Sequence, residues 1–173
     1  MLAHLRESVH RAATIVRRLR EMTMRGEVKR DSVSLGDCVR EATALALTGS
    51  TVTVSYDVPA KMVVLADRIQ LQQVLVNLVR NAIEAIGDRS DGRIDIAAKE
   101  EKGVVRLRVH DNGPGIPADV LPTIFDSFVS TKAQGMGVGL AISRTIIESH
   151  GGELTARSSP GEGATFDIVL PTA

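Results

Sequence analysis

The chain has 173 residues, of which 43% are hydrophobic and 24% charged, and its formal net charge at pH 7 is zero. This composition is that of a globular protein with room for one well-packed domain and one further element. No apolar run approaches the roughly 18–20 residues of a membrane helix, and the N-terminus lacks the basic-then-apolar layout of a signal peptide. The one cysteine cannot form an internal disulfide. We therefore expect a cytoplasmic protein with no membrane segment in this chain.

The first 30 residues carry a charge excess that the total conceals. Eight Arg and Lys face three Glu there, so the local balance is +5. A basic helix can bind nucleic acid, but no recognition motif accompanies this one. A solvated helix face, or a docking surface for an acidic protein, is the better interpretation. We expect no nucleic-acid partner.

A long helix is the first element that the pattern predicts. Its apolar residues alternate spacings of three and four, which is the a/d seam of a coiled coil. They are Leu2, Leu5, Val9, Ala12, Val16 and Leu19. Gly26 is a plausible end of this helix. The chain is accordingly divided into a heptad helix (1–26), a polar linker (27–34) and a larger domain (35–173).

The larger domain alternates helix and strand signals. Ser34 and Asp37 resemble a capping box that opens a short helix, and Asp67 can cap a longer amphipathic one that ends near Gly87. The expected helices cover 35–47, 68–86 and 137–149, and the expected strands cover 51–57, 62–65, 93–99, 104–110, 153–158 and 164–170. This order predicts an α+β sandwich, a mixed sheet with helices on one face.

The sequence DNGPG follows an expected strand at residues 111–115. Glycine lets the backbone turn tightly and approach a ligand closely, and an aspartate at a strand end can accept a hydrogen bond. An adenine amino group is one such donor. The same residues are also good turn chemistry, so an ordinary loop remains an alternative.

The sequence GMGVGL at residues 135–140 runs straight into a predicted helix. Backbone N–H groups at the start of a helix favour phosphate oxygens. The pattern is not a P-loop, which needs Lys and Ser or Thr after its last glycine. It is not the dinucleotide fingerprint either, because Ile142 stands where a third Gly or Ala belongs. A flexible loop before a helix is the alternative.

Asn77, Asn81 and Glu84 share one face of the long predicted helix, which is otherwise apolar there. An amide oxygen can coordinate Mg²⁺, a hard cation that prefers oxygen ligands and keeps several waters. A solvated helix face is the alternative, especially for Asn77 taken alone.

The loop at 112–136 is long enough to be a lid or a binding segment. It holds two of the three phenylalanines, Phe125 and Phe128, which can anchor such a lid, and Lys132, which can meet a phosphate. A satellite core under an ordinary loop is the alternative. If it is a lid, we expect about 114–136 to be mobile without nucleotide.

Taken in order, these motifs resemble the catalytic, ATP-binding domain of sensor histidine kinases. QLQQVLVNLVRNAIEA resembles the N box, DNGPGIP the first glycine box, IFDSFVSTK the phenylalanine box and GMGVGLAI the second glycine box. GEGATFDIVLP resembles the closing strand, and STKAQGMGVGL is similar to the nitrogen-regulatory and oxygen-sensing branches. The match covers roughly 35–171. It implies a Bergerat-type α/β sandwich, shared with gyrase, the Hsp90 chaperones and the MutL repair proteins.

The resemblance also implies a site for ATP and Mg²⁺. It assigns the adenine amino group to Asp111 with Thr165 supporting through water, and Mg²⁺ to Asn81 helped by Asn77. Asn81 and Lys132 are the residues that it places in catalysis. The nucleotide-binding set that it implies is Asn77, Asn81, Asp111, Gly113, Gly115, Lys132, Gly135, Gly137, Val138, Gly139, Leu140 and Thr165.

Two departures from the family pattern matter. Glu84 stands where many members have Lys or Arg, so Arg80 or Lys132 must supply that charge if the site has it. The acceptor histidine of the family precedes Glu or Asp, whereas His10 precedes Arg11. Residues 1–25 therefore resemble the second helix of the dimerisation hairpin. The partners implied are an acceptor-histidine hairpin, a response-regulator receiver domain and a second copy, joined as a homodimer through this helix.

The activity implied is transfer of the γ-phosphoryl group of ATP to a histidine and then to a receiver aspartate, a reaction catalysed mainly by positioning and charge stabilisation. Hydrolysis as in gyrase or Hsp90 is disfavoured, because Asn77 stands where those enzymes carry a water-activating glutamate. A serine kinase of the anti-sigma-factor type and a non-catalytic nucleotide-binding and dimerisation module remain as alternatives.

Overall fold

The computed structural model describes residues 29–127 and 137–173. The elements are β1 (Asp31–Ser34), α2 (Leu35–Ala46), β2 (Thr53–Asp57), β3 (Val63–Ala66), α3 (Arg68–Ile86), β4 (Arg93–Glu101), β5 (Val104–Asp111), the short 3₁₀ helix η1 (Leu121–Thr123), α4 (Gly139–Ser149), β6 (Glu153–Ser158) and β7 (Ala164–Pro171). The heptad helix expected at 1–26 lies outside the described residues and stays a prediction. No helix within the described ranges is long and apolar enough to cross a membrane.

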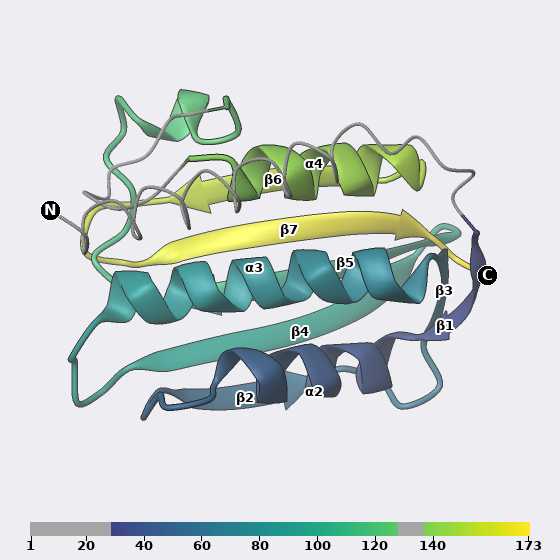
Figure 1. Cartoon of the computed structure of the whole chain (residues 1–173), viewed down its shortest axis with the longest axis horizontal. Coiled ribbons are helices and arrows are strands. Elements are labelled where there is room, and N and C mark those ends of the chain that lie inside the picture. Colours follow the sequence, from purple (N-terminus) through teal and green to yellow (C-terminus); the bar gives the residue numbers. More distant parts are fainter. Residues whose placement is uncertain (1–28, 128–136) are drawn as a thin grey trace, which may run out of the picture.

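Five strands form the main sheet, in the order β2-β4-β5-β7-β6. β2 runs parallel to β4 and the other neighbours are antiparallel, so the sheet is mixed as predicted. Helices α2, α3 and α4 lie side by side across one face of this sheet, with α3 in the middle (Figure 1). The predicted fold class, a mixed sheet with helices on one face, is confirmed.

The core fills the space between the helices and the sheet. On β5 and β7 every second residue is buried toward the helices, as the period of two in a strand requires. These residues are Val105, Leu107, Val109, Asp111, Ala164, Phe166, Ile168 and Leu170. Burying each large apolar side chain contributes about 1.5–3 kcal/mol relative to leaving it in water. Asp111 is the polar member of this buried row.

The ends of α3 are fixed by the residues that the sequence marked. Asp67 is the N-cap, and its Oδ1 accepts hydrogen bonds from the backbone N–H groups of Ile69 (2.9 Å) and Gln70 (3.0 Å). Gly87 is the C-cap with φ of 62°, and its N–H donates to Ile83. A capped helix has a defined start and rotation, which places the asparagines of α3 relative to the sheet.

The structure differs from the sequence prediction at 31–34, which was assigned to a linker. These residues form β1, which pairs antiparallel with β3 in a separate two-stranded sheet, and Val33 is buried there. Four residues are too few to show a strand period, and only the long-range pairing with β3 defines them. Ser34 is the N-cap of α2 as predicted, but its side chain makes no capping hydrogen bond.

The face of the sheet that α2, α3 and α4 leave uncovered carries a buried ion-pair cluster. Asp167 on β7 accepts hydrogen bonds from Arg108 (3.1 Å) and Arg157 (2.6 Å), whose own side chains are half exposed. Burial opposes ionisation of this carboxyl, but the two guanidinium groups outweigh it and hold the pKa of Asp167 below its ordinary value. The cluster therefore ties β5, β7 and β6 together while Asp167 is ionised.

Replacing Asp167 by Asn should lower the free energy of unfolding by about 1–2 kcal/mol at pH 7, because the amide cannot pair with both arginines. A carboxyl with a lowered pKa in the folded state stabilises the fold above its unfolded value of about 3.9, and the contribution disappears as the pH falls through the lower folded value. Urea unfolding of both proteins at pH 7 and in acid measures this difference.

Asp95→Asn is the matched control on the same face, because that carboxylate bonds to Ser55 and Arg93 in a more exposed position. Its effect should stay below about 0.5 kcal/mol. Equal effects of the two substitutions at pH 7 would contradict the role given to Asp167.

Candidate active site

Asp111 lies at the end of β5 under α3 and is 3% exposed. Its Oδ1 accepts hydrogen bonds from the backbone N–H groups of Gly113 (2.9 Å) and Ala164 (3.4 Å). Burial raises the pKa of this carboxyl, while these two donors and nearby His110 act in the lowering direction. With one oxygen held by backbone, the other is left to accept a hydrogen bond from a ligand.

Glycines let the backbone close around Asp111. Gly163 has a φ of 81°, and a Cβ there would collide with the carbonyl oxygen of Asp111. A Cβ at Gly113 would lie 2.8 Å from Asp111 Oδ1. The sequence marked Gly113 but not Gly163, whose contact with Asp111 joins positions far apart in the chain. Gly115 follows in the same loop, where a Cβ would lie 2.5 Å from the carbonyl oxygen of Ser159.

Hydrogen bonds join the loop after Asp111 to the turn between β6 and β7. The N–H of Gly161 donates to the carbonyl of Pro114 (2.8 Å), and the N–H of Ile116 donates to Ser158 Oγ (2.8 Å). Ser158 in turn donates to the carbonyl of Gly163 (2.6 Å). These contacts fix the part of the first glycine box that adjoins Asp111.

Thr165, the expected support for the adenine contact, is not brought together with Asp111. Its hydroxyl lies 2.9 Å from Nδ1 of His110, its partner across the strands. Successive residues of a strand point to opposite faces, so Thr165 and His110 share the open face while Asp111 points toward the helices. The residue beside Asp111 on that inner face is Ala164, which has no hydroxyl.

Helix α4 begins two residues later than the sequence predicted, at Gly139 with Val138 as N-cap. Gly137 precedes it with a φ of 62°. The first N–H groups of a helix, here from Gly139 and Leu140 onward, have no partner within the helix and point out of its end. Such an end favours phosphate. Lys132 and Gly135, expected to complete this loop, lie outside the described residues.

Asn77 and Asn81 lie one turn apart on α3, half-buried. Nδ2 of Asn77 donates to Ser143 Oγ on α4 at 3.0 Å, and a Cβ at Gly139 would lie 2.5 Å from Asn77 Oδ1. Asn77 is therefore at the junction of α3 with the first turn of α4. The side chain of Asn81 makes no hydrogen bond to another described residue, which leaves its amide oxygen available.

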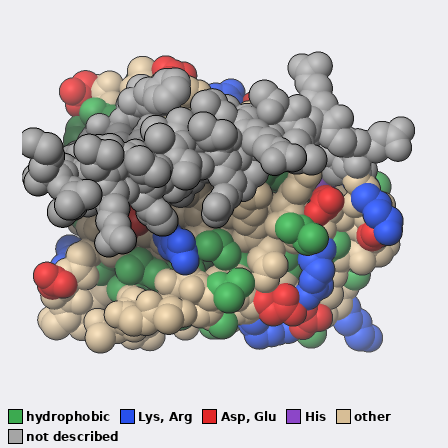
Figure 2. All heavy atoms as spheres, viewed as in Figure 1, with side chains coloured by type: hydrophobic (Ala, Val, Ile, Leu, Met, Phe, Trp, Pro, Cys, Tyr) green, Lys and Arg blue, Asp and Glu red, His purple; other side chains and the backbone are tan. Residues whose placement is uncertain are grey.

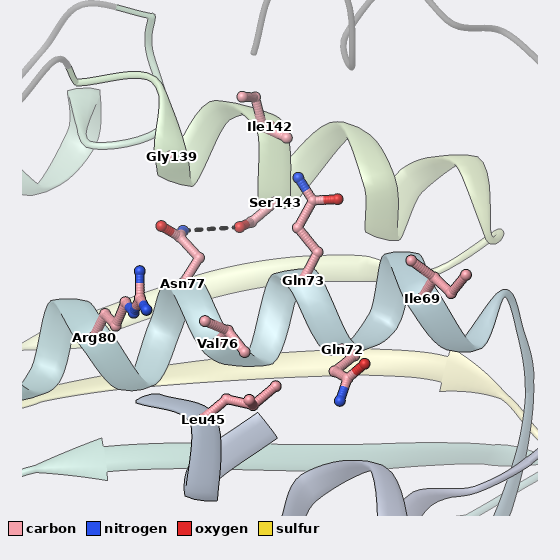
Figure 3. A pocket seen from close by; sticks show the side chains of 10 residues that line it. All are labelled: Leu45, Ile69, Gln72, Gln73, Val76, Asn77, Arg80, Gly139, Ile142 and Ser143. Carbon is pink, nitrogen blue, oxygen red and sulfur yellow. Dashed lines mark hydrogen bonds between the residues drawn. The ribbon is translucent and has the colours of Figure 1, made fainter. Parts of the chain in front are cut away.

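A groove of about 350 Å³ borders this junction. It is lined by Leu45, Ile69, Gln72, Gln73, Val76, Asn77, Arg80, Gly139, Ile142 and Ser143 (Figure 3). Leu45 and Ile69 at its rim are 55% and 76% exposed, and hydrophobic side chains are visible between charged ones on this side of the molecule (Figure 2). Arg80 brings a positive charge to the wall beside Asn77.

The described part of the long loop is held to the core by Phe125. Its ring meets Phe166 edge-on, with centroids 6.5 Å apart, and the guanidinium of Arg144 on α4 lies 5.4 Å from its centre. Such contacts contribute packing and cation–π stabilisation. Phe125 thus holds this part of the loop against the core, which agrees with both a lid and an ordinary loop over a satellite core, and Phe128 lies outside the described residues.

The residues present fit a magnesium ion that arrives with its nucleotide. The described residues contain no group of three or more His, Cys, Asp or Glu that could hold a metal by themselves. Mg²⁺ is commonly held by a few protein oxygens together with phosphate oxygens and water. The amide oxygens of Asn81 and Asn77 can supply the protein share of such a shell.

Comparison with known proteins decides the family. A model described as histidine kinase-, DNA gyrase B-, and HSP90-like ATPase matches residues 66–173. The chain belongs to this family. Within it, the catalytic domain of the histidine kinase ThkA superimposes with a TM-score of 0.74 at 34% sequence identity, covering 83% of this chain and 95% of that one. The described domain is therefore an ATP-binding catalytic domain of the histidine kinase type.

Two curated sensor proteins extend the comparison to nearly the whole chain. The sensor protein FixL of Bradyrhizobium diazoefficiens is 43% identical over 172 residues, which are 96% of this chain and 34% of FixL. The sensory histidine kinase/phosphatase NtrB of Rhizobium leguminosarum bv. phaseoli is 37% identical over 185 residues, 96% of this chain and 48% of NtrB. The chain spans about a third to a half of the length of these relatives.

ThkA has also been solved in complex with the response regulator protein TrrA. That structure gives a TM-score of 0.77 at 30% identity and covers 96% of this chain and 49% of the matched one.

Asp111→Asn should weaken ATP binding by about a hundredfold or more, because the amide places N–H donors where the carboxylate accepts. Since burial raises the pKa of Asp111, wild-type affinity should also begin to fall on acidification at a higher pH than for an ordinary aspartate. Isothermal titration between pH 5 and pH 8 measures both effects.

Asp119→Asn is the control, since it makes the same change of charge at an exposed position of the adjacent loop. It should leave the affinity and its pH dependence unchanged. An unaltered affinity in Asp111→Asn, with the fold intact by circular dichroism, would remove Asp111 from the adenine site.

Proposed function

We propose that this chain is the catalytic part of a two-component sensor kinase. It transfers the γ-phosphoryl group of ATP to a histidine, from which the phosphoryl group passes to a response regulator. The observation that carries the proposal is the buried Asp111 carboxylate, anchored through one oxygen at the end of β5, facing the same helix that bears Asn77 and Asn81. The carboxylate supplies a site for a purine amino group, and the amides lie toward the phosphate end.

The proposed roles are supported by the geometry of α3 and α4. Asp111 orients the adenine through its amino group, within the backbone turn of Gly113 and Gly115. The backbone N–H groups from Gly137 to Leu140, in the turn before α4 and its first residues, donate hydrogen bonds to the phosphate oxygens, and Asn81 with Asn77 presents amide oxygens to Mg²⁺. The Mg²⁺ ion neutralises charge on the phosphate oxygens when bound. Lys132 and Gly135 complete this proposal from the loop, and Arg80 is a second source of positive charge.

Transfer is favoured over hydrolysis by what stands at position 77. The amide of Asn77 is bonded to Ser143 and has no basic oxygen comparable to a carboxylate. It cannot remove a proton from water, whereas a neutral imidazole is already a good nucleophile and needs no strong base. The site therefore positions a phosphoryl donor for an incoming histidine.

The two described histidines do not serve as the acceptor. His150 is 1% exposed and both of its ring nitrogens are engaged, Nε2 with the N–H of Asp67 (2.9 Å) and Nδ1 with the carbonyl of Ile146 (2.7 Å). His110 is half-buried against Thr165 on the open face. In this proposal the acceptor is a histidine on the first helix of a dimerisation hairpin, residues 1–26 form the second helix of that hairpin with a dimer contact, and 27–30 connect it to β1 of the domain.

The proposed partner that takes the phosphoryl group next is the receiver domain of a response regulator. Its support is the similarity to ThkA, which was crystallised with a response regulator, together with the similarity to FixL and NtrB along nearly the whole chain. An aspartate of that receiver would take the phosphoryl group from the histidine.

Mixing the chain with γ-labelled ATP, Mg²⁺ and an isolated acceptor-histidine hairpin of a sensor kinase should place acid-labile, base-stable label on the hairpin, as expected of phosphohistidine. Exchanging the acceptor histidine for Gln in the hairpin provides the control and should abolish the label. Acid-stable label would point to a serine kinase, and bound ATP without any transfer would point to a non-catalytic nucleotide-binding module. Either result would overturn the proposal.

Asn81→Ala should reduce the affinity for Mg²⁺·ATP by about tenfold while changing the affinity for ATP in EDTA much less, because only the metal contact is lost. Gln70→Ala, which truncates a half-buried amide at the other end of α3, is the matched control. A loss of affinity that is the same with and without Mg²⁺ would contradict the ligand role of Asn81.

A further inference from the structure

Two side-chain hydrogen bonds link α4 to α3, one at the C-cap of α4 and one near the middle of both helices. At the C-terminal end of α4, His150 accepts a hydrogen bond from the N–H of Asp67, the N-cap of α3, and donates to Ile146. Nearer the N-terminal end, Asn77 donates to Ser143. Because α4 begins at the phosphate-binding turn and α3 carries the amides, these two contacts fix the phosphate end of the site relative to the metal end.

The Ser143 end of the contact with Asn77 is buried, although both residues border the groove. Ser143 is 2% exposed, and its Oγ receives Nδ2 of Asn77 at 3.0 Å. Losing one member of a buried hydrogen-bonded pair leaves the other without its partner. Ser143 was not marked by any sequence motif, because a serine within an amphipathic helix has many ordinary explanations.

In this contact Nδ2 is the end of the Asn77 amide that faces Ser143, so the oxygen is the end that faces the site. With Nδ2 directed at Ser143, the oxygen points away from it, toward Gly139 and the first turn of α4 (Figure 3). A primary amide has two nearly isosteric orientations, and they exchange an acceptor for two donors. Only the orientation seen here presents oxygen toward a metal ion.

Gly139 makes this arrangement possible. A Cβ at that position would lie 2.5 Å from Asn77 Oδ1 and 3.2 Å from its Nδ2, so any larger residue would push the amide off Ser143 or the helix off α3. The contact is therefore built from three positions on two helices: Asn77, Gly139 and Ser143.

We infer that Ser143 is a positioning residue for phosphoryl transfer, holding the Asn77 amide so that its oxygen faces the metal and phosphate end of the site. The inference rests on the proposed function and adds to it a residue that itself contacts neither metal nor nucleotide. Without the hydroxyl, the amide can turn over and present N–H groups to Mg²⁺. The loss should therefore appear in metal-dependent binding.

Four variants of the full chain separate the hydrogen bond from the space that Ser143 fills. Ser143→Ala removes the hydroxyl, while Ser143→Thr and Ser143→Val form a pair of equal shape that differs only in whether a hydroxyl is present. Thr145→Ala is the matched control on α4, since the Thr145 hydroxyl bonds to Ala141 of its own helix. The probe is the nonhydrolysable ATP analogue AMPPNP, titrated with Mg²⁺ and with EDTA.

Ser143→Ala and Ser143→Val should weaken binding of Mg²⁺·AMPPNP by about three- to tenfold and binding in EDTA by less than about twofold. Ser143→Thr should retain the wild-type preference for the Mg²⁺ complex more fully than Ser143→Val, and Thr145→Ala should match wild type. A purely structural role would lower the unfolding temperature and both affinities together. Equal losses with Mg²⁺ and EDTA, or no loss in Ser143→Ala, would overturn the inference.

A double-mutant cycle tests whether Ser143 acts through Asn77 even if a variant at 143 is less stable than the wild-type chain. If Ser143 acts through Asn77, Ser143→Ala should have little further effect on Mg²⁺·AMPPNP affinity in an Asn77→Ala background. Additive losses would overturn the inference. Absence of Mg²⁺·AMPPNP binding by the wild-type chain would instead contradict the proposed function itself.

Discussion

Everything in this site depends on keeping one carboxylate buried at the end of a strand. Asp111 occupies a position on β5 whose neighbours on the same face are apolar and face the helices. An unpaired buried carboxylate is costly, and the structure meets that cost with the backbone N–H groups of Gly113 and Ala164. One donor lies in the loop after β5 and the other is the first residue of β7, and the backbone approaches Asp111 closely at both places because glycine stands at 113 and 163. The arrangement leaves the second carboxylate oxygen as an acceptor among apolar neighbours, where a ligand hydrogen bond is stronger than in water.

The second requirement is that the amide-bearing helix and the phosphate-binding turn hold a fixed relation. Helix α3 lies in the middle of its layer and has a buried face against the sheet, so its position is set by the core. Helix α4 is set against α3 by the close approach of Gly139 to the Asn77 side chain and by the hydrogen bonds of Asn77 with Ser143 and of His150 with Asp67. The core and the site are thus not separate regions, because the same helix serves both with opposite faces.

The sequence predicted the features that are local or strongly periodic. The cap at Asp67, the amphipathic face of α3, the alternation on β5 and the glycine-rich turn after Asp111 all follow from residues close together in the chain, and the structure has them. β1 was missed because its four residues gain their conformation from pairing with β3. The sequence prediction put Thr165 beside Asp111, whereas the neighbouring residue Ala164 takes that place and Thr165 points to the opposite face of the sheet. Motif spacing alone does not say which face a strand residue takes. Gly163 and Ser143 matter through contacts with residues more than 50 positions away, which no local pattern reveals.

Because α3 packs on the core with one face and carries the site amides on the other, its length cannot change freely. Each residue added to a helix rotates everything beyond it by about 100°. A single insertion between the buried Leu71 and Asn77 would turn the amides toward the sheet and bring apolar side chains to the nucleotide. The turn between α3 and β4, residues 88–92, carries no such restriction because it lies beyond the helix cap at Gly87. Length variation in relatives of this domain should therefore be tolerated in that turn and excluded from the helix, whatever signal each kinase receives.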